Sequence, residues 1–338
     1  MINELNQLKA LLESPNRFII LAHKSPDGDA VGSAAAFFHF LSNISCDAQV
    51  VLPDLPSDTL LPFMADTKCL YFTENPGDVK TLFEESSVLI CLDFNASSRV
   101  GEMHSLVDGF KGVKVMIDHH PEPEPFSDIM ISDVTNSSTC QLIYECIELM
   151  QLTHAIDQHV ARSLYLGIMT DTGSFRFPST TASVHKIVAH LKELGLQHAK
   201  IHENIYDNST EGRLKFMGNA FLNRMTVLPE FKTAVMAIPK SDIYKFELKT
   251  GDTEGLVNYL LSIEGIKFAA ILIDREEERK WSFRSKGNFD VNIFARTHFE
   301  GGGHANAAGG RSSKSLDETL NDFKTIIENY KSQLTQLK

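Results

Sequence analysis

The sequence predicts an α/β protein in which a parallel-sheet domain with helices on both faces is followed by a smaller α/β domain. The chain has 338 residues, which is enough for two hydrophobic cores. Short runs at 18–22, 87–92 and 113–117 are rich in β-branched residues and apolar on both faces, as buried parallel strands are. Helical patterns lie between such runs, and parallel strands need these crossovers.

The larger domain is predicted to cover residues 1–196. A short amphipathic helix is expected from about Leu5 to Leu12, ahead of Pro15. The Ala- and Phe-rich segment from Ala30 to Leu41 predicts a helix that follows Asp29 directly, and its dipole would favour a phosphate bound at its amino terminus. Further expected elements are a strand at 48–52 and helices that open at 137–139 and run to 150, and at 159–171 and 180–196.

The second half of the chain predicts a connection followed by the smaller domain. Residues 197–226 are mixed, helical and polar, and we interpret them as the interdomain linker, with residues 227–338 as the second domain. Strands are expected at 232–238, 267–273 and 280–284, and helices at 254–261 and 316–334. Between them lies a glycine-rich stretch from Gly301 to Gly310.

Acidic residues and histidines follow the predicted strands of the larger domain. The clusters are His23-Lys24-Ser25-Pro26-Asp27-Gly28-Asp29, Leu92-Asp93-Phe94-Asn95, Asp118-His119-His120-Pro121 and Thr170-Asp171-Thr172-Gly173. In an open α/β sheet, ligands bind beyond the carboxyl ends of the strands, so we expect these side chains at one edge of one sheet. Carboxylates and imidazoles without cysteine suit a hard or borderline divalent metal. There are too many ligands for one ion, and a pair of ions that share a carboxylate is a device for attacking phosphorus.

Charge and cysteine usage limit the class of partner. The net charge is −12, which opposes binding of long duplex nucleic acid but permits a short anionic substrate, because bound cations would reverse the local sign. The five cysteines form no Cys-x-x-Cys pair and suit reduced thiols. The amino terminus lacks the features of a signal peptide, and no apolar run approaches the length of a membrane span. We therefore expect a soluble, cytoplasmic protein with no membrane partner.

Together with Gly301-Gly302-Gly303-His304-x-x-Ala307-Ala308-Gly309, these clusters resemble the DHH phosphoesterase superfamily, in the subgroup with a DHHA1 carboxy-terminal domain. The resemblance covers nearly the whole chain and is strongest to the nanoRNase/pAp-phosphatase branch. It implies an active site in the cleft between the two domains. It also implies a cofactor of two divalent ions, usually Mn²⁺, with Mg²⁺ as the alternative.

The resemblance also implies roles for individual residues. His23, Asp27 and Asp93 would hold one metal, and Asp29, Asp93, His119 and Asp171 would hold the other, with Asp93 as the bridge. His120 would face the substrate phosphate or the leaving oxygen, so that His120 and Asp93 are the expected catalytic residues. Asp118 would orient a neighbouring group. In the second domain, Arg284, Ser285 and His304 would bind substrate, and Gly302 and Gly303 would let backbone N–H groups approach an anion.

Plainer interpretations exist for several of these residues. Arg284 lies among Arg275, Arg279, Lys280 and Lys286, which together could form a solvated strand edge. The stretch from Gly301 to Gly310 could be a tight turn. Ser138 and Thr139 most simply cap the helix that follows them.

The functional hypothesis is a two-metal phosphoesterase that uses a metal-bridging hydroxide to hydrolyse short oligoribonucleotides or 3′-phosphoadenosine 5′-phosphate. The alternatives are a cyclic- or linear-dinucleotide phosphodiesterase, an inorganic pyrophosphatase or exopolyphosphatase, and a nucleotide-binding regulator without turnover. The sequence does not fix the oligomeric state, although exposed faces of the small domain could pair two copies in a homodimer.

Overall fold

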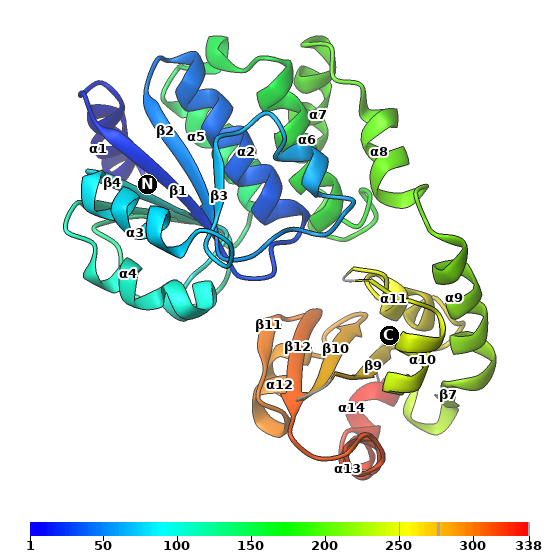
Figure 1. Ribbon diagram of the computed structural model, residues 1–338. Coiled ribbons are helices and arrows are strands. Elements are labelled where there is room, and N and C mark those ends of the chain that lie inside the picture. The colour runs from blue at the N-terminus through cyan, green and yellow to red at the C-terminus, as the bar shows by residue number, and fades with distance from the viewer. Residues whose placement is uncertain (250, 276–277, 337–338) are drawn as a thin grey trace. The chain divides into compact units, whose positions relative to one another are not determined.

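The computed structural model describes residues 1–249, 251–275 and 278–336. These residues divide into two compact units, unit 1 (Met1–Asn208) and unit 2 (Ser209–Lys338) (Figure 1). The sequence-predicted linker, residues 197–226, spans this division and contains one helix from each unit. The predicted boundaries at 196 and 226 stay predictions.

Unit 1 is built on a six-stranded sheet within the described residues, and all of its strand pairs are parallel. The spatial order is β3-β2-β1-β4-β5-β6. The strands are β1 (Arg17–Ala22), β2 (Asp47–Leu52), β3 (Cys69–Tyr71), β4 (Val88–Leu92), β5 (Val113–Asp118) and β6 (Ile129–Ser132). The sequence predicted β1, β2, β4 and β5 but gave no signal for the short strands β3 and β6.

Helices cover both faces of this sheet, as the sequence predicted. The helices are α1 (Ile2–Leu12), α2 (Gly28–Asn43), α3 (Pro76–Glu85), α4 (His104–Gly109), α5 (Thr139–Leu149), α6 (Gln158–Asp171), α7 (Ala182–Glu193) and α8 (His198–Tyr206). Alternate residues of one strand point to opposite faces. In β1, Ile20 packs with the helix layer that contains α1, α2, α5, α6 and α7, whereas Ile19 and Leu21 pack with α3 and α4. Both faces of the sheet are therefore buried.

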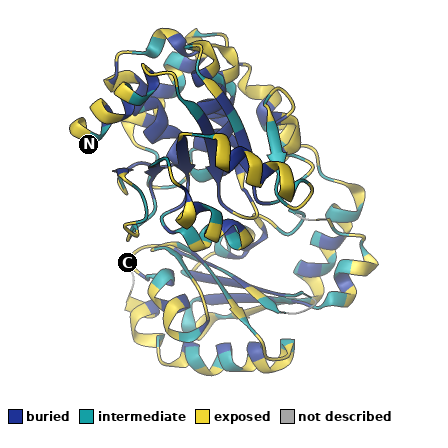
Figure 2. Cartoon of the chain, turned by 60° about the vertical axis from the view of Figure 1, so that its left-hand side comes forward, coloured by how far each residue is buried: buried dark blue, intermediate teal, exposed yellow. Residues whose placement is uncertain are grey.

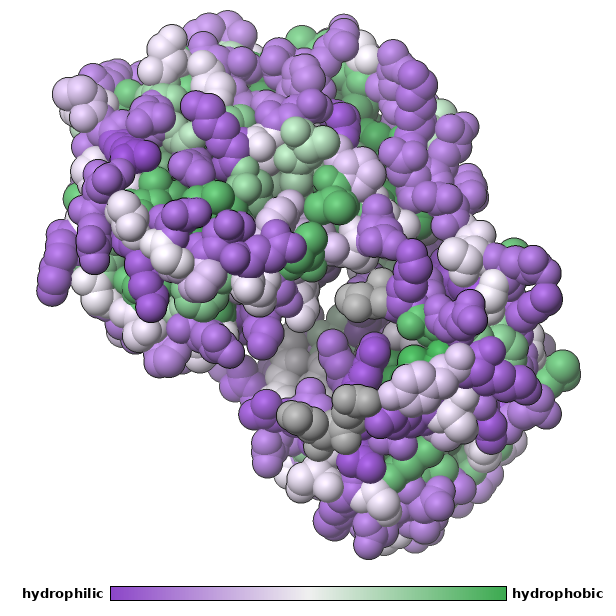
Figure 3. Space-filling model, viewed as in Figure 1, coloured by the Kyte–Doolittle hydropathy of each residue, from purple (hydrophilic) through white to green (hydrophobic). Residues whose placement is uncertain are grey.

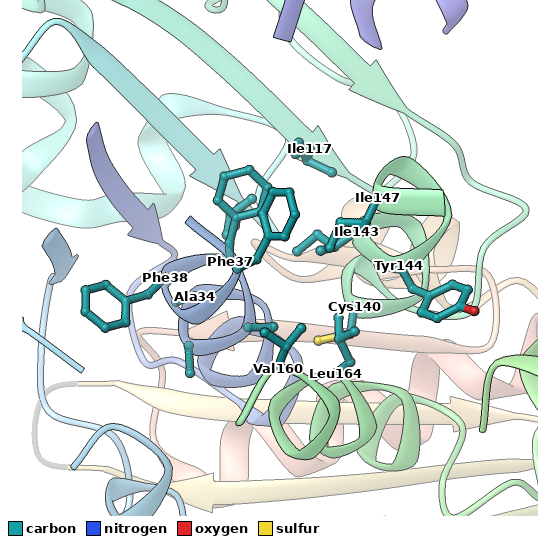
Figure 4. Packing of buried hydrophobic residues seen from close by; sticks show 14 of the residues in the cluster. Ala34, Phe37, Phe38, Ile117, Cys140, Ile143, Tyr144, Ile147, Val160 and Leu164 are labelled. Atoms are coloured by element: carbon teal, nitrogen blue, oxygen red, sulfur yellow. The ribbon is translucent and has the colours of Figure 1, made fainter. Parts of the chain in front are cut away.

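Helices α2, α5 and α6 pack closely beside the sheet. Figure 4 shows side chains from all three, including Phe37, Cys140 and Leu164, in one packed cluster that also contains Ile117 of β5. The close approach of α2 and α6 depends on glycine. A Cβ atom at Gly32 would lie 2.6 Å from the carbonyl oxygen of Ser163, so only glycine fits at this crossing.

Unit 2 contains a mixed six-stranded sheet within its described residues, in the order β11-β12-β10-β9-β8-β7. Only the β8–β9 pair is parallel. The strands are β7 (Met225–Leu228), β8 (Thr233–Ile238), β9 (Phe268–Asp274), β10 (Arg279–Ser285), β11 (Gly302–His304) and β12 (Ala307–Ser312). The helices are α9 (Glu211–Asn223), α10 (Lys240–Lys245), α11 (Leu256–Leu261), α12 (Val291–His298), α13 (Leu316–Glu328) and α14 (Lys331–Gln336). One face packs with α9 and α11, and the other with α12, α13 and α14. The predicted smaller α/β domain is confirmed.

One prediction for unit 2 was wrong in detail. The helix expected over 316–334 is interrupted at Asn329 and Tyr330, where the Tyr330 ring packs with Phe289 and Phe294 and its hydroxyl pairs with His298 Nε2 at 2.7 Å. The glycine-rich stretch, for which a tight turn was the plainer alternative, forms the hairpin of β11 and β12. Its strands were missed because glycine carries no side chain from which a period of two could be read.

Surface and interior are clearly separated in both units. Figure 2 shows the central strands of unit 1 in the buried colour, with exposed residues on the outer faces of the helices. On the face in Figure 3, hydrophilic side chains predominate and apolar ones are scattered. In the part of the chain that the structure describes, no helix is both long and apolar enough to span a membrane.

Candidate metal centre

The predicted site residues of unit 1 follow three neighbouring strands in the middle of the sheet. His23 comes directly after β1, and Asp93 directly after β4. Asp118 ends β5, and His119 and His120 follow it. Because β1, β4 and β5 are parallel neighbours, their carboxyl ends bring these residues together at one edge of the sheet.

Two helices add the remaining carboxylates. Asp27 caps α2 and accepts hydrogen bonds from the N–H groups of Asp29 and Ala30, both at 3.1 Å. Two N–H groups at the amino terminus of α2, where the helix dipole was expected to favour a phosphate, therefore donate to Asp27. Asp29 lies in the first turn of α2 and is fully buried. Asp171 is the last residue of α6.

The first group of ligand-type atoms comes from His23, Asp27 and Asp93. His23 Nε2 lies 3.5 Å from Asp93 Oδ2 and 3.8 Å from Asp27 Oδ1. Nε2 is buried and has no hydrogen-bond partner among the described residues. The other ring nitrogen, Nδ1, is 2.8 Å from the carbonyl oxygen of Lys24, which can only accept, so Nδ1 carries a proton and Nε2 is the nitrogen that would bind a cation.

The second group comes from Asp29, His119 and Asp171, with Asp93 beside them. His119 Nε2 lies 3.4 Å from Asp171 Oδ2, 3.7 Å from Asp93 Oδ1 and 3.8 Å from Asp29 Oδ2. His119 Nδ1 is 3.2 Å from the carbonyl oxygen of Asn136, which fixes the same tautomer as in His23. Both imidazoles thus turn Nε2 toward carboxylates.

Asp93 belongs to both groups through different oxygens. Its Oδ2 faces His23, and its Oδ1 faces His119. Its backbone has φ +65°, a left-handed conformation that Asp tolerates better than most residues, and its N–H donates to the carbonyl oxygen of Ile117 at 3.2 Å. A buried carboxylate with one oxygen toward each group has the arrangement of a bridging ligand.

These residues fit divalent cations. Ligand atoms about 2.1 Å from one ion at tetrahedral or right angles lie roughly 3.0–3.5 Å apart. The separations of 3.4–3.8 Å within each group are close to this range and too long for good hydrogen bonds. His23 Nε2 is buried beside carboxylates without a hydrogen-bond partner among the described residues, and a cation placed between these groups would explain this arrangement.

The electrostatics of the centre also favour cations. Burial and the charges of Asp93 and Asp171 raise the pKa of Asp29 well above its ordinary value. Burial raises the pKa of Asp171 to about 6, although its interaction with His119 opposes the shift. Burial alone would lower the pKa of His119, but Asp171 and the other carboxylates outweigh it and raise the pKa to about 10. Without cations, protons must balance the crowded negative charge.

His120 lies beside the two groups, with its Nδ1 3.7 Å from Asp93 Oδ1. Its Nδ1 lies 2.7 Å from Asp118 Oδ1, and its backbone N–H donates to Asp118 Oδ2 at 3.1 Å. Asp118 is fully buried, and it contacts the imidazole of His120 through one oxygen and the backbone of His120 through the other. This geometry agrees with the predicted orienting role of Asp118.

Sequence reasoning missed the contribution of α5. Ser138 caps this helix, as expected, by accepting from the N–H of Gln141 at 3.0 Å. Thr139 and Cys140 instead donate their N–H groups to the two oxygens of Asp29, at 2.6 Å and 3.0 Å. Nothing in a Ser-Ser-Thr sequence distinguishes a capping residue from one that contacts a distant carboxylate.

The sheet of unit 2 aligns two of the predicted substrate-binding residues. Arg284 of β10 and His304 of β11 are both directly opposite Ala307 of β12. Opposite residues in neighbouring strands point to the same face, so Arg284 and His304 share one face. Phe283, the preceding residue of β10, points into the core on the other face.

The other predicted residues of unit 2 make contacts within their own unit. The hydroxyl of Ser285 donates to the carbonyl oxygen of Phe289 at 2.6 Å and accepts from Asn306 Nδ2 at 2.9 Å. The N–H of Gly303 donates to Asn292 Oδ1 at 3.0 Å. Gly302 lies in β11 and pairs with Gly309 of β12. The substrate-binding role of these residues stays a prediction.

Comparison with known families assigns the architecture. Residues 17–168 match the DHH family, N-terminal domain, and residues 231–333 match the DHHA1 domain. The chain belongs to the DHH–DHHA1 family of phosphoesterases. The family resemblance inferred from the motifs is confirmed, and the two matched segments lie in unit 1 and unit 2, respectively.

Known DHH–DHHA1 proteins resemble the chain over nearly its full length. The bifunctional oligoribonuclease and PAP phosphatase NrnA of Bacillus subtilis is 27% identical over 92% of this chain and 95% of its own. NrnA of Thermus thermophilus is 28% identical over 94% of this chain and 90% of its own. The crystal structure of an exopolyphosphatase-related protein from Bacteroides fragilis is 34% identical, covers 99% of this chain and 98% of its own, and superimposes with a TM-score of 0.95.

Proposed function

We propose that this phosphoesterase uses two divalent cations, Mn²⁺ before Mg²⁺, to hydrolyse short oligoribonucleotides and 3′-phosphoadenosine 5′-phosphate. The observation that carries the two-cation proposal is the division of the Asp93 oxygens between two groups of ligand-type atoms. The substrate class is supported by similarity to the two NrnA proteins and by the net charge of −12, which disfavours long nucleic acid.

The residues of unit 1 would divide the work of holding the cations. His23, Asp27 and Asp93 would hold one, and Asp29, Asp93, His119 and Asp171 the other. Cations held there would lower the pKa of a bound water for attack on phosphorus and would neutralise charge on the phosphoryl oxygens. The backbone carbonyls of Lys24 and Asn136 keep the two imidazoles in the tautomer that binds a cation.

His120 is proposed to manage a proton at the leaving group. Because Nδ1 is committed to Asp118, a proton exchanged with the leaving oxygen would pass through Nε2. Asp118 would hold the ring in place and stabilise the imidazole when it carries a positive charge. This arrangement resembles the carboxylate–imidazole pairs that serve general acid–base catalysis.

Unit 2 is proposed to bind the remainder of the substrate. Arg284 offers a planar guanidinium that can bind a phosphate with two hydrogen bonds, and His304 shares its sheet face.

We place the reaction in the cytoplasm. All five cysteines are free, and burial raises the pKa of the Cys146 thiol to about 12. Buried reduced thiols of this kind suit a reducing compartment.

The proposal is tested by hydrolysis of a substrate panel with Mn²⁺. The panel contains a dinucleotide, a five-residue RNA, a long RNA, 3′-phosphoadenosine 5′-phosphate, a cyclic dinucleotide and pyrophosphate. Turnover confined to the short RNAs and the bisphosphate is the expected result. Cleavage mainly of the cyclic dinucleotide or of pyrophosphate would contradict the substrate assignment, and binding of nucleotide without turnover would contradict the enzymatic assignment.

A further inference from the structure

Thr139, the first residue of α5, donates hydrogen bonds to two carboxylates of the candidate centre, those of Asp29 and Asp93. The residue is fully buried. Its N–H donates to Asp29 Oδ2 at 2.6 Å, and its hydroxyl donates to Asp93 Oδ1 at 2.8 Å. Thr139 therefore contacts a carboxylate of the second group through its backbone and the carboxylate shared by both groups through its side chain.

The helix end explains why Asp29 is held firmly. The first N–H groups of a helix have no partner within it, and buried ones need an acceptor. Asp29 accepts from two of them, those of Thr139 and Cys140, and its negative charge is favoured at a helix amino terminus. These bonds come from the backbone and would survive a change of the Thr139 side chain.

The hydroxyl of Thr139 controls a different property, the rotation of the Asp93 carboxylate. Oδ1 receives this hydrogen bond and lies 3.7 Å from His119 Nε2, while Oδ2 lies 3.5 Å from His23 Nε2. A carboxylate can rotate about its Cβ–Cγ bond and turn both oxygens toward one cation. A donor fixed to one oxygen restrains this rotation and keeps one oxygen toward each group.

We propose that Thr139 is a positioning residue that makes Asp93 a bridging ligand and thereby couples the binding of the two cations. This inference rests on the proposed two-cation function. The neighbouring Ser138 provides the contrast, because its hydroxyl accepts from the N–H of Gln141 and serves only the helix.

The experiment compares three variants of the full chain, stripped of metal and titrated with Mn²⁺. Thr139→Val keeps the shape and the N–H of threonine but removes the hydroxyl, Thr139→Ser keeps the hydroxyl, and Ser138→Ala removes the cap of the same helix. Binding is followed by equilibrium dialysis. Electron paramagnetic resonance at two Mn²⁺ per chain distinguishes a spin-coupled pair from isolated ions. Circular dichroism melts without metal monitor the fold.

We expect Thr139→Val to bind its second Mn²⁺ about 10- to 100-fold more weakly than the wild type, the usual effect of losing a residue that orients a metal ligand. The spin-coupled spectrum should be lost in Thr139→Val and kept in Thr139→Ser and Ser138→Ala. If Thr139→Val melts early, Thr139→Ala provides the same comparison without the added methyl contact.

Wild-type affinity for both ions together with a coupled spectrum in the hydroxyl-free variants would overturn the role of Thr139. That result is distinct from failure of the proposed function. A wild-type protein that binds two coupled Mn²⁺ ions but hydrolyses no phosphoester would overturn the function alone.

Discussion

The two units present their predicted functional residues in opposite ways. In unit 1, Asp29, Asp93 and His119 are buried, and their polar atoms face one another across 3.7–3.8 Å. In unit 2, Arg284 and His304 are only partly buried on one face of a sheet, beside glycines. In a buried polar cluster, the residue types alone indicate the kind of ligand that the cluster can bind. On an open sheet face, a binding role also depends on which residues surround the polar side chains.

The glycines beside Arg284 and His304 differ in whether the packing of unit 2 requires them. A Cβ atom at Gly303, which has φ +149°, would lie 2.5 Å from the carbonyl oxygen of Ala307, so the hairpin itself requires glycine there. A Cβ atom at Gly309 would meet nothing closer than 3.5 Å, and the same holds for its partner Gly302. Glycine weakens a strand, so the packing of unit 2 does not explain Gly302 and Gly309. Their lack of side chains leaves the face beside Arg284 and His304 flat.

The largest effect is expected for Asp93→Ala in unit 1. The variant removes the shared carboxylate, so kcat should fall by about 10⁴-fold or more, as when a residue central to catalysis is deleted. Circular dichroism should show the fold intact. Steady-state hydrolysis of a dinucleotide with Mn²⁺ measures the loss, and wild-type turnover would refute the metal assignment.

Gly167→Ala tests whether the carboxylates of unit 1 depend on close helix packing. The new methyl group would lie 2.3 Å from Asp29 Oδ1 and 2.3 Å from Cys140 Sγ, so Asp29 must move. We expect Mn²⁺ affinity to fall by about 10- to 100-fold. The matched control is Gly218→Ala within α9, where a Cβ meets nothing within 4 Å and alanine should raise the free energy of unfolding by about 1 kcal/mol. Equal metal affinity in the Gly167 variant and the wild type would contradict the packing explanation.

Arg284→Ala and His304→Ala should separate substrate binding from metal binding. Each should raise KM by about 10- to 100-fold, the effect of losing a hydrogen bond to a charged group. Metal content per chain, measured by elemental analysis, should remain that of the wild type. Loss of metal in either variant would contradict the assignment of substrate binding, rather than metal binding, to unit 2.

The smallest effects are expected for alanine substitutions of Gly309, which the packing does not require, and of Gly303, which the hairpin requires. Gly309→Ala should leave the free energy of unfolding unchanged or slightly raised but increase KM about tenfold, because a methyl group occupies the flat face. Gly303→Ala should instead lower the free energy of unfolding by about 1–3 kcal/mol. Denaturant unfolding and steady-state kinetics on both variants measure the difference. An unchanged KM in Gly309→Ala would contradict a contact between the substrate and the sheet face beside Arg284 and His304.

The sequence predicted the parallel sheet and the convergence of its polar clusters because apolar strands and the residues after them lie next to each other in the chain. His23, Asp93 and His119 follow their strands directly, so the order β2-β1-β4-β5 at the centre of the sheet was enough to unite them. The role of Thr139 could not be predicted, since its partners are 110 and 46 residues away. The hairpin of β11 and β12 was missed because glycines carry no pattern.

The most direct test of the account is the number of Mn²⁺ ions bound per chain. The protein is stripped with chelator, and binding is measured by equilibrium dialysis for the wild type and for His23→Ala. Because His23 belongs only to the first group, the account predicts two ions in the wild type and one in the variant. A single ion in the wild type, or two undiminished ions in His23→Ala, would contradict the two-cation centre.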